Sequence, residues 1–352
     1  RFGGISRVFA ELAKQFISQS ELGVELQPVA APLVNEYILR DPILAEALAV
    51  RRARHWGPTI ARSLVRRRHR GPADIVHNTF YFPRALADYP QAKRVVTIHD
   101  MIPELFPATR RRLDFLTAKH RYIERADLIV CVSESTKRDL LQTYGEITTP
   151  ITVVPSGVSP DFFPGLPRIS GWPSNYFLHV GHRTGYKAGS TLFRAFTQVV
   201  KEDTDVQLVL VGGGPLSQSE SALLAKLGIT TRVTQQQVPD SLMPNAYANA
   251  RGFVLPSEYE GFGLPVLEAM AAGTPAVLSD SSSLPEVGGD AASYFRQGDV
   301  EHLAEALWRI LVRDGERIEL VARGLERAKR FTWGETARKM KAAYVKTLEV
   351  SP

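Results

Sequence analysis

Two glutamates flank a glycine loop in the second half of the sequence. Glu260 lies in the loop Pro256–Gly263, and Glu268 follows in the helix predicted to open at Leu264. Pro265 suits the first turn of that helix, where a missing N–H costs nothing. An apolar strand, a glycine loop and a helix N-terminus in this order direct free N–H groups at one point, which favours a phosphate or another anion. The two carboxylates accept hydrogen bonds, which a sugar or ribose can donate.

Two cations form a second group of candidates. Arg183 and Lys187 lie in the segment Gly181–Lys187, directly after the apolar run Tyr176–Val180. Open α/β sheets bind ligands at the carboxyl ends of their strands, where this segment is expected. An arginine can grip two oxygens of a diphosphate, and a lysine acts as a point charge. We therefore predict that both cations bind a diphosphate; a solvated basic loop is the alternative.

A histidine marks the corresponding edge in the first half. His99 follows the predicted strand Arg94–Ile98, so it is expected at the carboxyl edge of a sheet, facing a cleft. The alternative is a structural histidine. Its neighbour Asp100 either orients the imidazole or caps the following loop.

The elements that position these residues repeat along the chain. Short β-branched runs alternate with segments of helical period, which predicts βα units and parallel sheets covered on both faces. The predicted strands are Asp74–His77, Arg94–Ile98, Leu128–Val132 and Ile151–Val154 in the first half, and Tyr176–Val180, Val206–Val211, Gly252–Leu255 and Pro275–Leu278 in the second. Two sheets are therefore expected.

The boundaries of the two halves also follow from composition. The Pro- and Gly-rich segment Ser156–Pro173 is predicted to be an interdomain hinge. A helical pattern begins almost at once after Gly3-Gly4, although such a glycine turn normally follows a strand, so we expect that the numbered chain lacks its first strand. The tail Phe331–Val350 is predicted to be a helix long enough to pack on a neighbouring domain.

Composition limits the class of protein. The 352 residues include 43 Lys and Arg, 37 Asp and Glu, and one cysteine, Cys131, so a disulfide scaffold is excluded. No apolar stretch approaches the ~18 residues of a membrane span, and a cytoplasmic protein is expected.

The stretch Arg51–Arg70 carries eight arginines and no acid, and Arg110–Arg112 adds a second basic cluster. The first of these is expected to contact an anionic membrane surface, with a solvated basic helix as the alternative.

The pattern of motifs resembles that of a known family. The stretch Tyr176–Ser279 is similar to the donor-binding domain of the retaining glycosyltransferases of family 4, two-domain enzymes of the GT-B fold. The motifs that carry the resemblance are Gly181–Lys187, Leu208–Gly214, Val238–Asp240 with Tyr247, and Glu260–Glu268 in the second half, and Gly3–Arg7, Thr97–Pro103, Ala126–Ser133 and Val154–Val158 in the first. Nearly the whole chain is covered, and bacterial mannosyltransferases that build O-antigen or related surface polysaccharides are the most similar members.

The resemblance implies an α/β fold with two Rossmann-like domains that face a cleft. Residues 1–160 would bind the acceptor and residues 170–332 the donor, and a C-terminal helix over 333–352 would pack on the first domain. The residues that the resemblance assigns to the site are Glu260, Phe262, Gly263 and Leu264 for the transferred sugar and diphosphate, Arg183 and Lys187 for the diphosphate, Glu268 for the ribose, Gly4 for close approach to the phosphates and His99 for the sugar. Base recognition would fall near Val233–Pro239. Arg183 and Lys187 are closer in sequence than the family's pair, and Ser156 stands where the family often has Asn.

Two further patterns suggest metals but are interpreted otherwise. Asp203-Thr204-Asp205 has the Asp-x-Asp form, but it precedes a predicted strand and so lies at the wrong end of the sheet. His179 and His182 have no third ligand nearby. We therefore expect no metal.

Together with the resemblance, these residues predict a metal-independent hexosyltransferase, and the resemblance implies that it is retaining. The subfamily resemblance implies GDP-mannose as the first donor and a UDP-hexose as the second, with no separate cofactor. The acceptor would be a glycan or a lipid-diphosphate-linked glycan in bacterial surface polysaccharide synthesis, which places the protein at the inner face of the cell membrane. The alternatives are a GT-B phosphorylase or sugar-nucleotide epimerase, and a non-catalytic basic protein that binds lipid or nucleic acid; the first interpretation involves no nucleic acid.

Overall fold

The chain divides into two compact units. The computed structural model describes residues 4–26, 73–79, 91–109, 113–202 and 205–349, with the single positions 37, 41, 44, 81 and 89. Unit 1 comprises the described residues of Arg1–Val132, Lys137–Ser156 and Trp333–Pro352. Unit 2 comprises those of Ser133–Thr136 and Gly157–Thr332.

The chain enters the main part of unit 2 after Ser156 and leaves it after Thr332. These crossings lie beside the predicted domain ends at 160 and 332, and the predicted hinge Ser156–Pro173 belongs to unit 2 from Gly157 onward. Val158 forms a parallel bridge with Thr332, and its N–H donates to the Phe331 carbonyl at 2.9 Å. The outgoing and returning segments are therefore hydrogen-bonded to each other.

Unit 1 is built on a parallel sheet whose described strands follow one another in chain order, β1-β2-β3-β4. The strands are β1 (Ile75–Asn78), β2 (Lys93–Ile98), β3 (Leu128–Cys131) and β4 (Ile151–Val153). All four residues of β3 are buried, as expected for a parallel strand covered on both faces.

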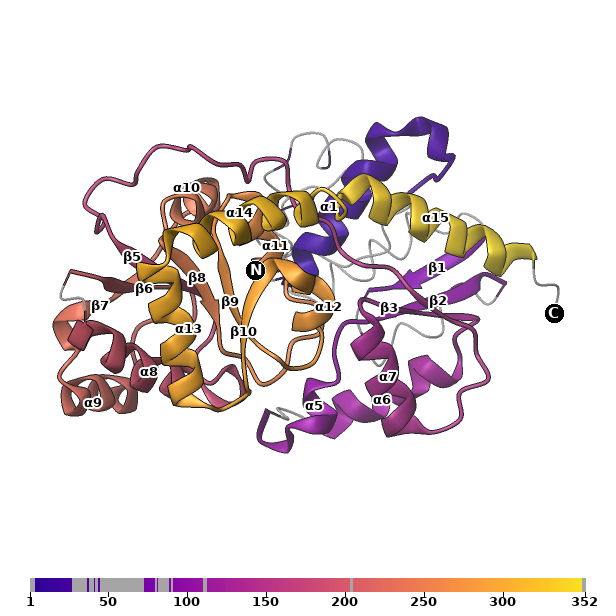
Figure 1. Cartoon of the computed structure of the whole chain (residues 1–352). Coiled ribbons are helices and arrows are strands. Elements are labelled where there is room, and N and C mark those ends of the chain that lie inside the picture. Colours follow the sequence, from indigo (N-terminus) through magenta and orange to yellow (C-terminus); the bar gives the residue numbers. More distant parts are fainter. Residues whose placement is uncertain are drawn as a thin grey trace, which may run out of the picture. The chain divides into compact units, whose positions relative to one another are not determined.

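Helices from both ends of the described chain cover this sheet. The helices of unit 1 include α1 (Gly4–Ser18), α5 (Ile102–Leu105), α6 (Leu113–Glu124), α7 (Glu134–Tyr144, whose first turn is grouped with unit 2) and α15 (Trp333–Glu349), with the short helices η1 (Ser20–Leu22) and η3 (Pro107–Thr109). In α1, Leu12 and Phe16 lie on one stripe, and they form one apolar cluster with Val95 of β2 and with Ala337 and Met340 of α15. The first and last helices of Figure 1 therefore pack in the same core.

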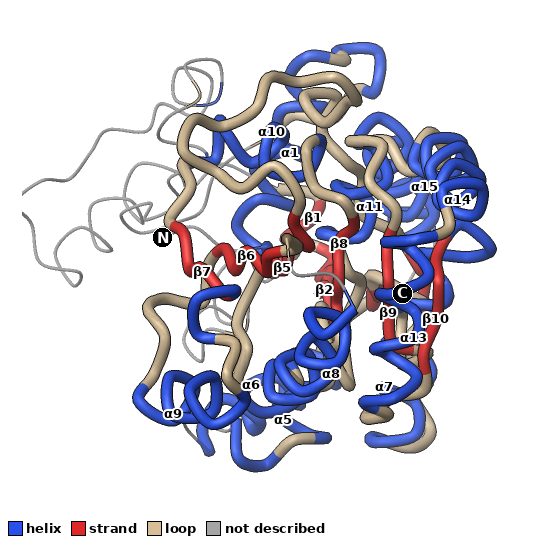
Figure 2. The backbone as a smooth tube through the Cα atoms, turned by 60° about the vertical axis from the view of Figure 1, so that its left-hand side comes forward, coloured by secondary structure: helices blue, strands red, loops and turns tan. Residues whose placement is uncertain are grey.

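Unit 2 is built on a parallel six-stranded sheet with the order β7-β6-β5-β8-β9-β10. The strands are β5 (Tyr176–Val180), β6 (Gln207–Val211), β7 (Val233–Gln236), β8 (Gly252–Leu255), β9 (Ala276–Ser279) and β10 (Ala292–Phe295). Figure 2 shows β7, β6, β5 and β8 following one another across the unit. This is the strand order of a doubly wound dinucleotide-binding sheet, which changes direction between β5 and β8.

The helices of unit 2 connect these strands. They are α8 (Gly189–Glu202), α9 (Gln218–Leu227), α10 (Met243–Ala248), α11 (Leu264–Ala271), α12 (Leu284–Gly288), α13 (Val300–Val312) and α14 (Asp314–Ala328), with η4 (Gly185–Lys187), η5 (Thr230–Arg232), η6 (Asp240–Leu242) and η7 (Gly289–Ala291). Phe193 and Phe196 of α8 and Leu307 and Ile310 of α13 are buried in one cluster with Phe177 of β5. Burial of this apolar stripe holds α8 and α13 on the sheet.

The predicted fold class, two parallel α/β sheets, is confirmed. Each of the eight predicted strands is present within one residue at either end. Two strands were missed, β7 and β10, and both lie at edges of the unit 2 sheet. Edge strands are less enclosed, so β7 tolerates the polar sequence Val-Thr-Gln-Gln and shows no continuous apolar run.

Candidate functional site

The two groups of candidates in the second half meet at the point where the strand order of unit 2 changes direction. Strand β5 pairs with β8, and the loops that follow them are Gly181–Lys187 and Pro256–Gly263. The N–H of Glu258 donates to the carbonyl of Tyr186 at 2.7 Å and so joins the two loops. Doubly wound sheets bind their ligands in the crevice outside such a point.

Lys187 and Glu260 form an ion pair at this place. The Lys187 Nζ lies 2.7 Å from the Glu260 Oε1, and the two side chains are 17% and 13% exposed. The ammonium also lies 5.1 Å from the centre of the Tyr186 ring, within reach of a cation–π interaction. The structure therefore brings together one cation and one carboxylate that the sequence analysis assigned to the diphosphate and the sugar.

Helix α11 begins beside this pair. It opens at Leu264 after Gly263, whose φ of 101° is unfavourable for residues with a side chain, and no side chain caps its N-terminus. A Cβ added at Gly263 would lie 3.1 Å from the Leu284 Cδ2, so the position also lacks room. With Pro265 in the first turn, the helix presents uncapped N–H groups and the positive end of its dipole near Glu260.

Glu268 lies in the second turn of α11 and is 6% exposed. The Tyr247 hydroxyl donates to its Oε2 at 2.8 Å, and Tyr247 is itself fully buried against Phe162 and Phe253. The carboxylate is thus fixed in position, and its predicted contact with a ribose stays a prediction.

Arg183 has different surroundings from those that the sequence suggested. Its side chain is 2% exposed, and its Nε donates to Glu220 at 2.6 Å. Its remaining nitrogens donate to the carbonyls of Gly212, Gly214 and Pro215 at 2.9, 3.0 and 3.3 Å. Although burial pushes the pKa of Glu220 upward, the hydrogen bonds from Arg183 and Ser217 hold it below its usual value. The guanidinium therefore anchors the glycine loop after β6, and the predicted contact of Arg183 with a diphosphate stays a prediction.

The glycine loop after β6 requires its composition. Gly212, Gly213 and Gly214 have φ values of 76°, 68° and 77°. A Cβ on Gly213 would lie 2.6 Å from the Gly181 carbonyl oxygen and 2.7 Å from the Arg183 guanidinium. At Gly213 the loop can therefore pack this closely against the β5 loop only because that residue has no side chain.

His99 lies at the carboxyl end of β2 in unit 1 and is 8% exposed. Its Nε2 lies 3.3 Å from the Thr79 carbonyl, and its ring packs edge-on to Phe9. Burial, together with the charge of Lys119, lowers the pKa of His99 to about 4, although the contact with Thr79 opposes that shift. Asp100 accepts from the N–H of Ile102 at 3.0 Å, a contact that the capping interpretation predicts.

A second buried histidine of unit 1 was missed by the sequence analysis. His77 lies in β1, with Nδ1 2.6 Å from the Tyr344 hydroxyl of α15 and Nε2 2.7 Å from Thr97 Oγ1. Burial, and to a lesser degree His99, lowers its pKa to about 3. No sequence signal singled it out, because a histidine inside a strand has the same pattern whether or not it is hydrogen-bonded.

The remaining first-half predictions concern Gly4 and the two basic clusters. Gly4 is exposed at the start of α1, with no atom within 4 Å of an added Cβ, so close approach to a phosphate stays a prediction. The stretches Arg51–Arg70 and Arg110–Arg112 lie outside the described residues.

Two sequence patterns resembled metal ligands, the pair His179 and His182 and the segment Asp203-Thr204-Asp205. His179 is buried, with its ring nitrogens 3.1 Å from the Val254 carbonyl and 3.2 Å from the His182 carbonyl, and burial lowers its pKa. Asp203 lies outside the described residues. Among the residues that the structure describes, no group of three or more His, Cys, Asp or Glu side chains could hold a metal ion.

Within that same part of the chain, no helix is long and apolar enough to cross a membrane.

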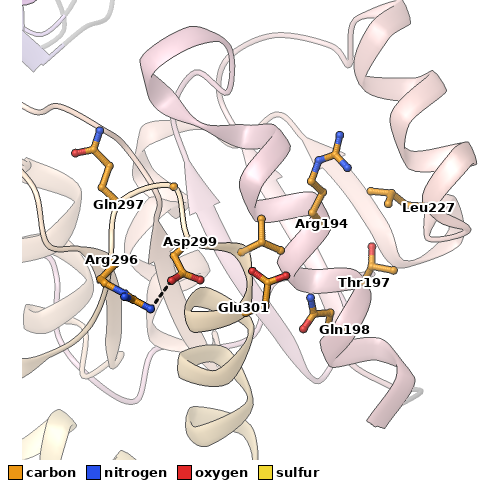
Figure 3. A pocket seen from close by; sticks show the side chains of 10 residues that line it. Arg194, Thr197, Gln198, Leu227, Arg296, Gln297, Asp299 and Glu301 are labelled. Carbon is orange, nitrogen blue, oxygen red and sulfur yellow. Dashed lines mark ion pairs between the residues drawn. The ribbon is translucent and has the colours of Figure 1, made fainter.

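A hollow of about 730 Å³ lies elsewhere on unit 2. Figure 3 shows Arg194, Thr197 and Gln198 of α8 on one side of it and the ion pair of Arg296 with Asp299 on the other. None of the predicted site residues lines it. The hollow is therefore separate from the Lys187–Glu260 site.

Comparisons with known proteins agree with this geometry. Residues 167–330 match the family described as Glycosyl transferases group 1, and residues 2–162 match Glycosyltransferase Family 4. The chain is 30% identical to the O-antigen chain mannosyltransferase B of Escherichia coli over 316 residues, which cover 84% of this chain and 78% of that protein. It is 32% identical to the MMP alpha-(1->4)-mannosyltransferase of Mycolicibacterium hassiacum over 250 residues, 69% of this chain and 59% of that protein.

The solved structures extend the likeness of fold to almost the whole chain. Anabaena HepE, solved in complex with UDP and glucose, matches with a TM-score of 0.76 at 17% identity and covers 98% of this chain and 96% of its own. The chain therefore belongs to the glycosyltransferases of family 4, which have the GT-B fold, and it is close to the bacterial mannosyltransferases.

Proposed function

We propose that the protein transfers mannose from GDP-mannose to a hydroxyl of a glycan or lipid-diphosphate-linked glycan, with retention at the anomeric carbon. A UDP-hexose is the second candidate donor. The mannosyltransferases of Escherichia coli and Mycolicibacterium hassiacum support the choice of mannose, and the O-antigen relative supports a glycan acceptor in surface polysaccharide synthesis.

One observation carries the proposal: the pairing of Lys187 with Glu260 beside the uncapped start of α11. A diphosphate at this point would meet an ammonium and the positive end of a helix dipole, both of which favour negative charge. The incoming diphosphate competes with Glu260 for Lys187, and the released carboxylate can then accept hydrogen bonds from hydroxyls of the transferred sugar.

In the transfer step, the bond between the sugar C1 and the phosphate oxygen breaks, and the nucleoside diphosphate leaves with the bonding electrons. The acceptor oxygen bonds to C1 on the same face, and its proton passes to the departing phosphate oxygen. Lys187 and the α11 start stabilise the charge that grows on the leaving group, which is electrostatic catalysis. No residue of the chain is assigned as a nucleophile, and no separate cofactor is assigned, because the donor already carries the activated sugar.

The remaining predicted residues take supporting roles in this proposal. Glu268, held by Tyr247, would accept hydrogen bonds from the ribose hydroxyls. Arg183 would hold the loop Gly212–Gly214 in place rather than contact the diphosphate itself. His99 of unit 1 keeps its predicted contact with the sugar, as a neutral imidazole because its pKa is about 4.

The proposal is tested by incubating the protein with GDP-mannose, UDP-glucose or UDP-galactose and an acceptor glycan. We expect release of GDP from GDP-mannose that depends on the acceptor, and an α-linked product by NMR, because the donor is α-linked. Release from a UDP-hexose alone would correct the donor. An epimerised sugar nucleotide, or no release from any donor, would reject the proposed transfer.

A further inference from the structure

The turn that follows β9 is hydrogen-bonded through serine hydroxyls to the loop Pro256–Gly263, which carries Glu260. We call Ser279–Ser283, which connects β9 to α12, the serine turn. Ser279 and Ser281 both donate to the Ser257 carbonyl, at 2.5 and 3.0 Å. Ser282 and Ser283 contact the loop further along, at Glu260 and beyond. The serine turn therefore bonds the loop at both its start and its middle.

Glu260 is fixed at every polar group of its backbone by this turn. Its N–H donates to Ser282 Oγ at 2.8 Å, and its carbonyl accepts from Ser283 Oγ at 2.9 Å. Ser283 also donates to the carbonyl of Phe262 at 2.9 Å and is fully buried. With both of its polar groups bonded, the backbone of Glu260 has little freedom to take another position.

The backbone of Ser282 has an unusual conformation for a residue with a side chain. It has a φ of 49°, in the left-handed region that residues with a side chain rarely adopt. A glycine would adopt this conformation without strain, but it would offer no oxygen to the Glu260 N–H. Strained conformations of this kind persist where the surrounding structure needs them, and here the need is the hydrogen bond to Glu260.

We propose that Ser282 and Ser283 are positioning residues that set the place of Glu260 against the transferred sugar. The inference rests on the proposed function, because it gives Glu260 the sugar as its partner. Neither serine has a hydrogen bond to Lys187 or Glu268. Their loss should therefore impair the transfer step much more than the binding of the nucleoside diphosphate.

The experiment compares Ser282→Ala, Ser282→Gly and Ser283→Ala in the full chain. The matched control is Ser281→Ala, because the Ser257 carbonyl keeps its bond from Ser279. The measurements are kcat with the donor that the wild-type protein uses, the Kd of its nucleoside diphosphate (GDP or UDP) and Tm. We expect kcat to fall by about 10-fold or more in the three test variants, with Kd within about twofold of wild type, and the control to stay near wild type.

Ser282→Gly separates positioning from stability. It removes the strain, so a merely structural role predicts unchanged or raised Tm together with wild-type kcat, whereas positioning predicts a lowered kcat in a protein of normal Tm. Wild-type kcat in Ser282→Gly or Ser282→Ala, or equal losses in kcat and nucleotide affinity, would overturn the inference. A wild-type protein that releases no nucleoside diphosphate from any donor would instead reject the proposed function beneath it.

Discussion

The candidate residues of unit 2 and the buried histidines of unit 1 differ in charge and in exposure. At the edge of unit 2, Lys187 and Glu260 form a partly exposed ion pair. At the edge of unit 1, His77 and His99 are buried and have pKa values of about 3 and 4, so both are neutral at pH 7. The same architecture thus holds a partly exposed ion pair in one unit and two buried, neutral histidines in the other.

A similar contrast exists within one loop of unit 2. Arg183 and Lys187 are both cations after β5, yet Arg183 is bonded to Glu220 and three carbonyls while Lys187 pairs with a carboxylate of the site. Cations that are close in sequence can therefore have different surroundings, one bonded to loop carbonyls and the other paired with Glu260.

The largest expected effect is that of Lys187→Ala. It should lower kcat by about 1,000-fold, because the growing charge of the leaving group loses its ammonium. Tm should change by little, since partly exposed ion pairs contribute little to stability. Steady-state kinetics and a thermal melt measure both, with Lys226→Ala on α9 as the control. Retention of most activity would remove Lys187 from the diphosphate site.

Arg183→Ala tests the contrast within the loop. The change leaves Glu220 and the loop carbonyls without their donor, so unit 2 should lose about 3 kcal/mol of stability and Tm should fall. Arg194→Ala, at an exposed position of α8, is the control. At temperatures where the variant is folded, its nucleotide affinity should fall less than that of Lys187→Ala. A normal Tm with a matching loss of affinity would support the direct contact of Arg183 with the diphosphate that the sequence predicts.

Glu260→Gln tests the proposed contact between the Glu260 carboxylate and the transferred sugar. We expect kcat to fall by about 100-fold, since an amide replaces one acceptor oxygen by a donor where the sugar hydroxyls approach. Nucleoside diphosphate affinity, measured by calorimetry, should be equal or slightly higher because Lys187 is no longer paired. Equal loss of transfer and of nucleotide binding would move Glu260 from the sugar to the diphosphate.

His77→Asn tests whether His77 is buried as a neutral imidazole, and it has the smallest expected effect. The folded-state pKa of about 3 lies below the ordinary value of 6.5, so the unfolded state binds the proton first. The stability that neutral His77 contributes is complete above about pH 6.5 and is lost as the pH falls toward 3, by about 1.4 kcal/mol per pH unit. Between pH 7 and 5, Tm should therefore fall less steeply in His77→Asn than in wild type. Identical slopes would show that His77 is not buried as the neutral form.

The sequence analysis was most successful where local patterns dictate structure. Continuous apolar runs located the strands whose ends carry the candidate residues, and the strand, glycine loop and proline located the start of α11. The same reasoning gave Arg183 and Lys187 one role, because spacing shows only that two cations share a loop. Their partners, Glu220 and Glu260, lie 37 and 73 residues away. Long-range contacts of this kind leave no local signal.

The serine turn was overlooked for a related reason. Ser279–Ser283 has the composition of any polar loop, and nothing local indicates that its hydroxyls bond the segment around Glu260, 22 and 23 residues earlier. The edge strands β7 and β10 were also missed, since β7 is mostly polar and Ser293 interrupts the apolar residues of β10.

The packing of α1 against α15 has a consequence for how the protein is made. The ribosome delivers Leu12 and Phe16 long before their partners Ala337 and Met340, which follow the whole of unit 2 in the sequence. Unit 2, whose main segment Gly157–Thr332 is continuous, can assemble while the chain is still growing. Until α15 is made, the apolar stripe of α1 lacks this partner. We expect chaperones to bind that stripe in the nascent chain.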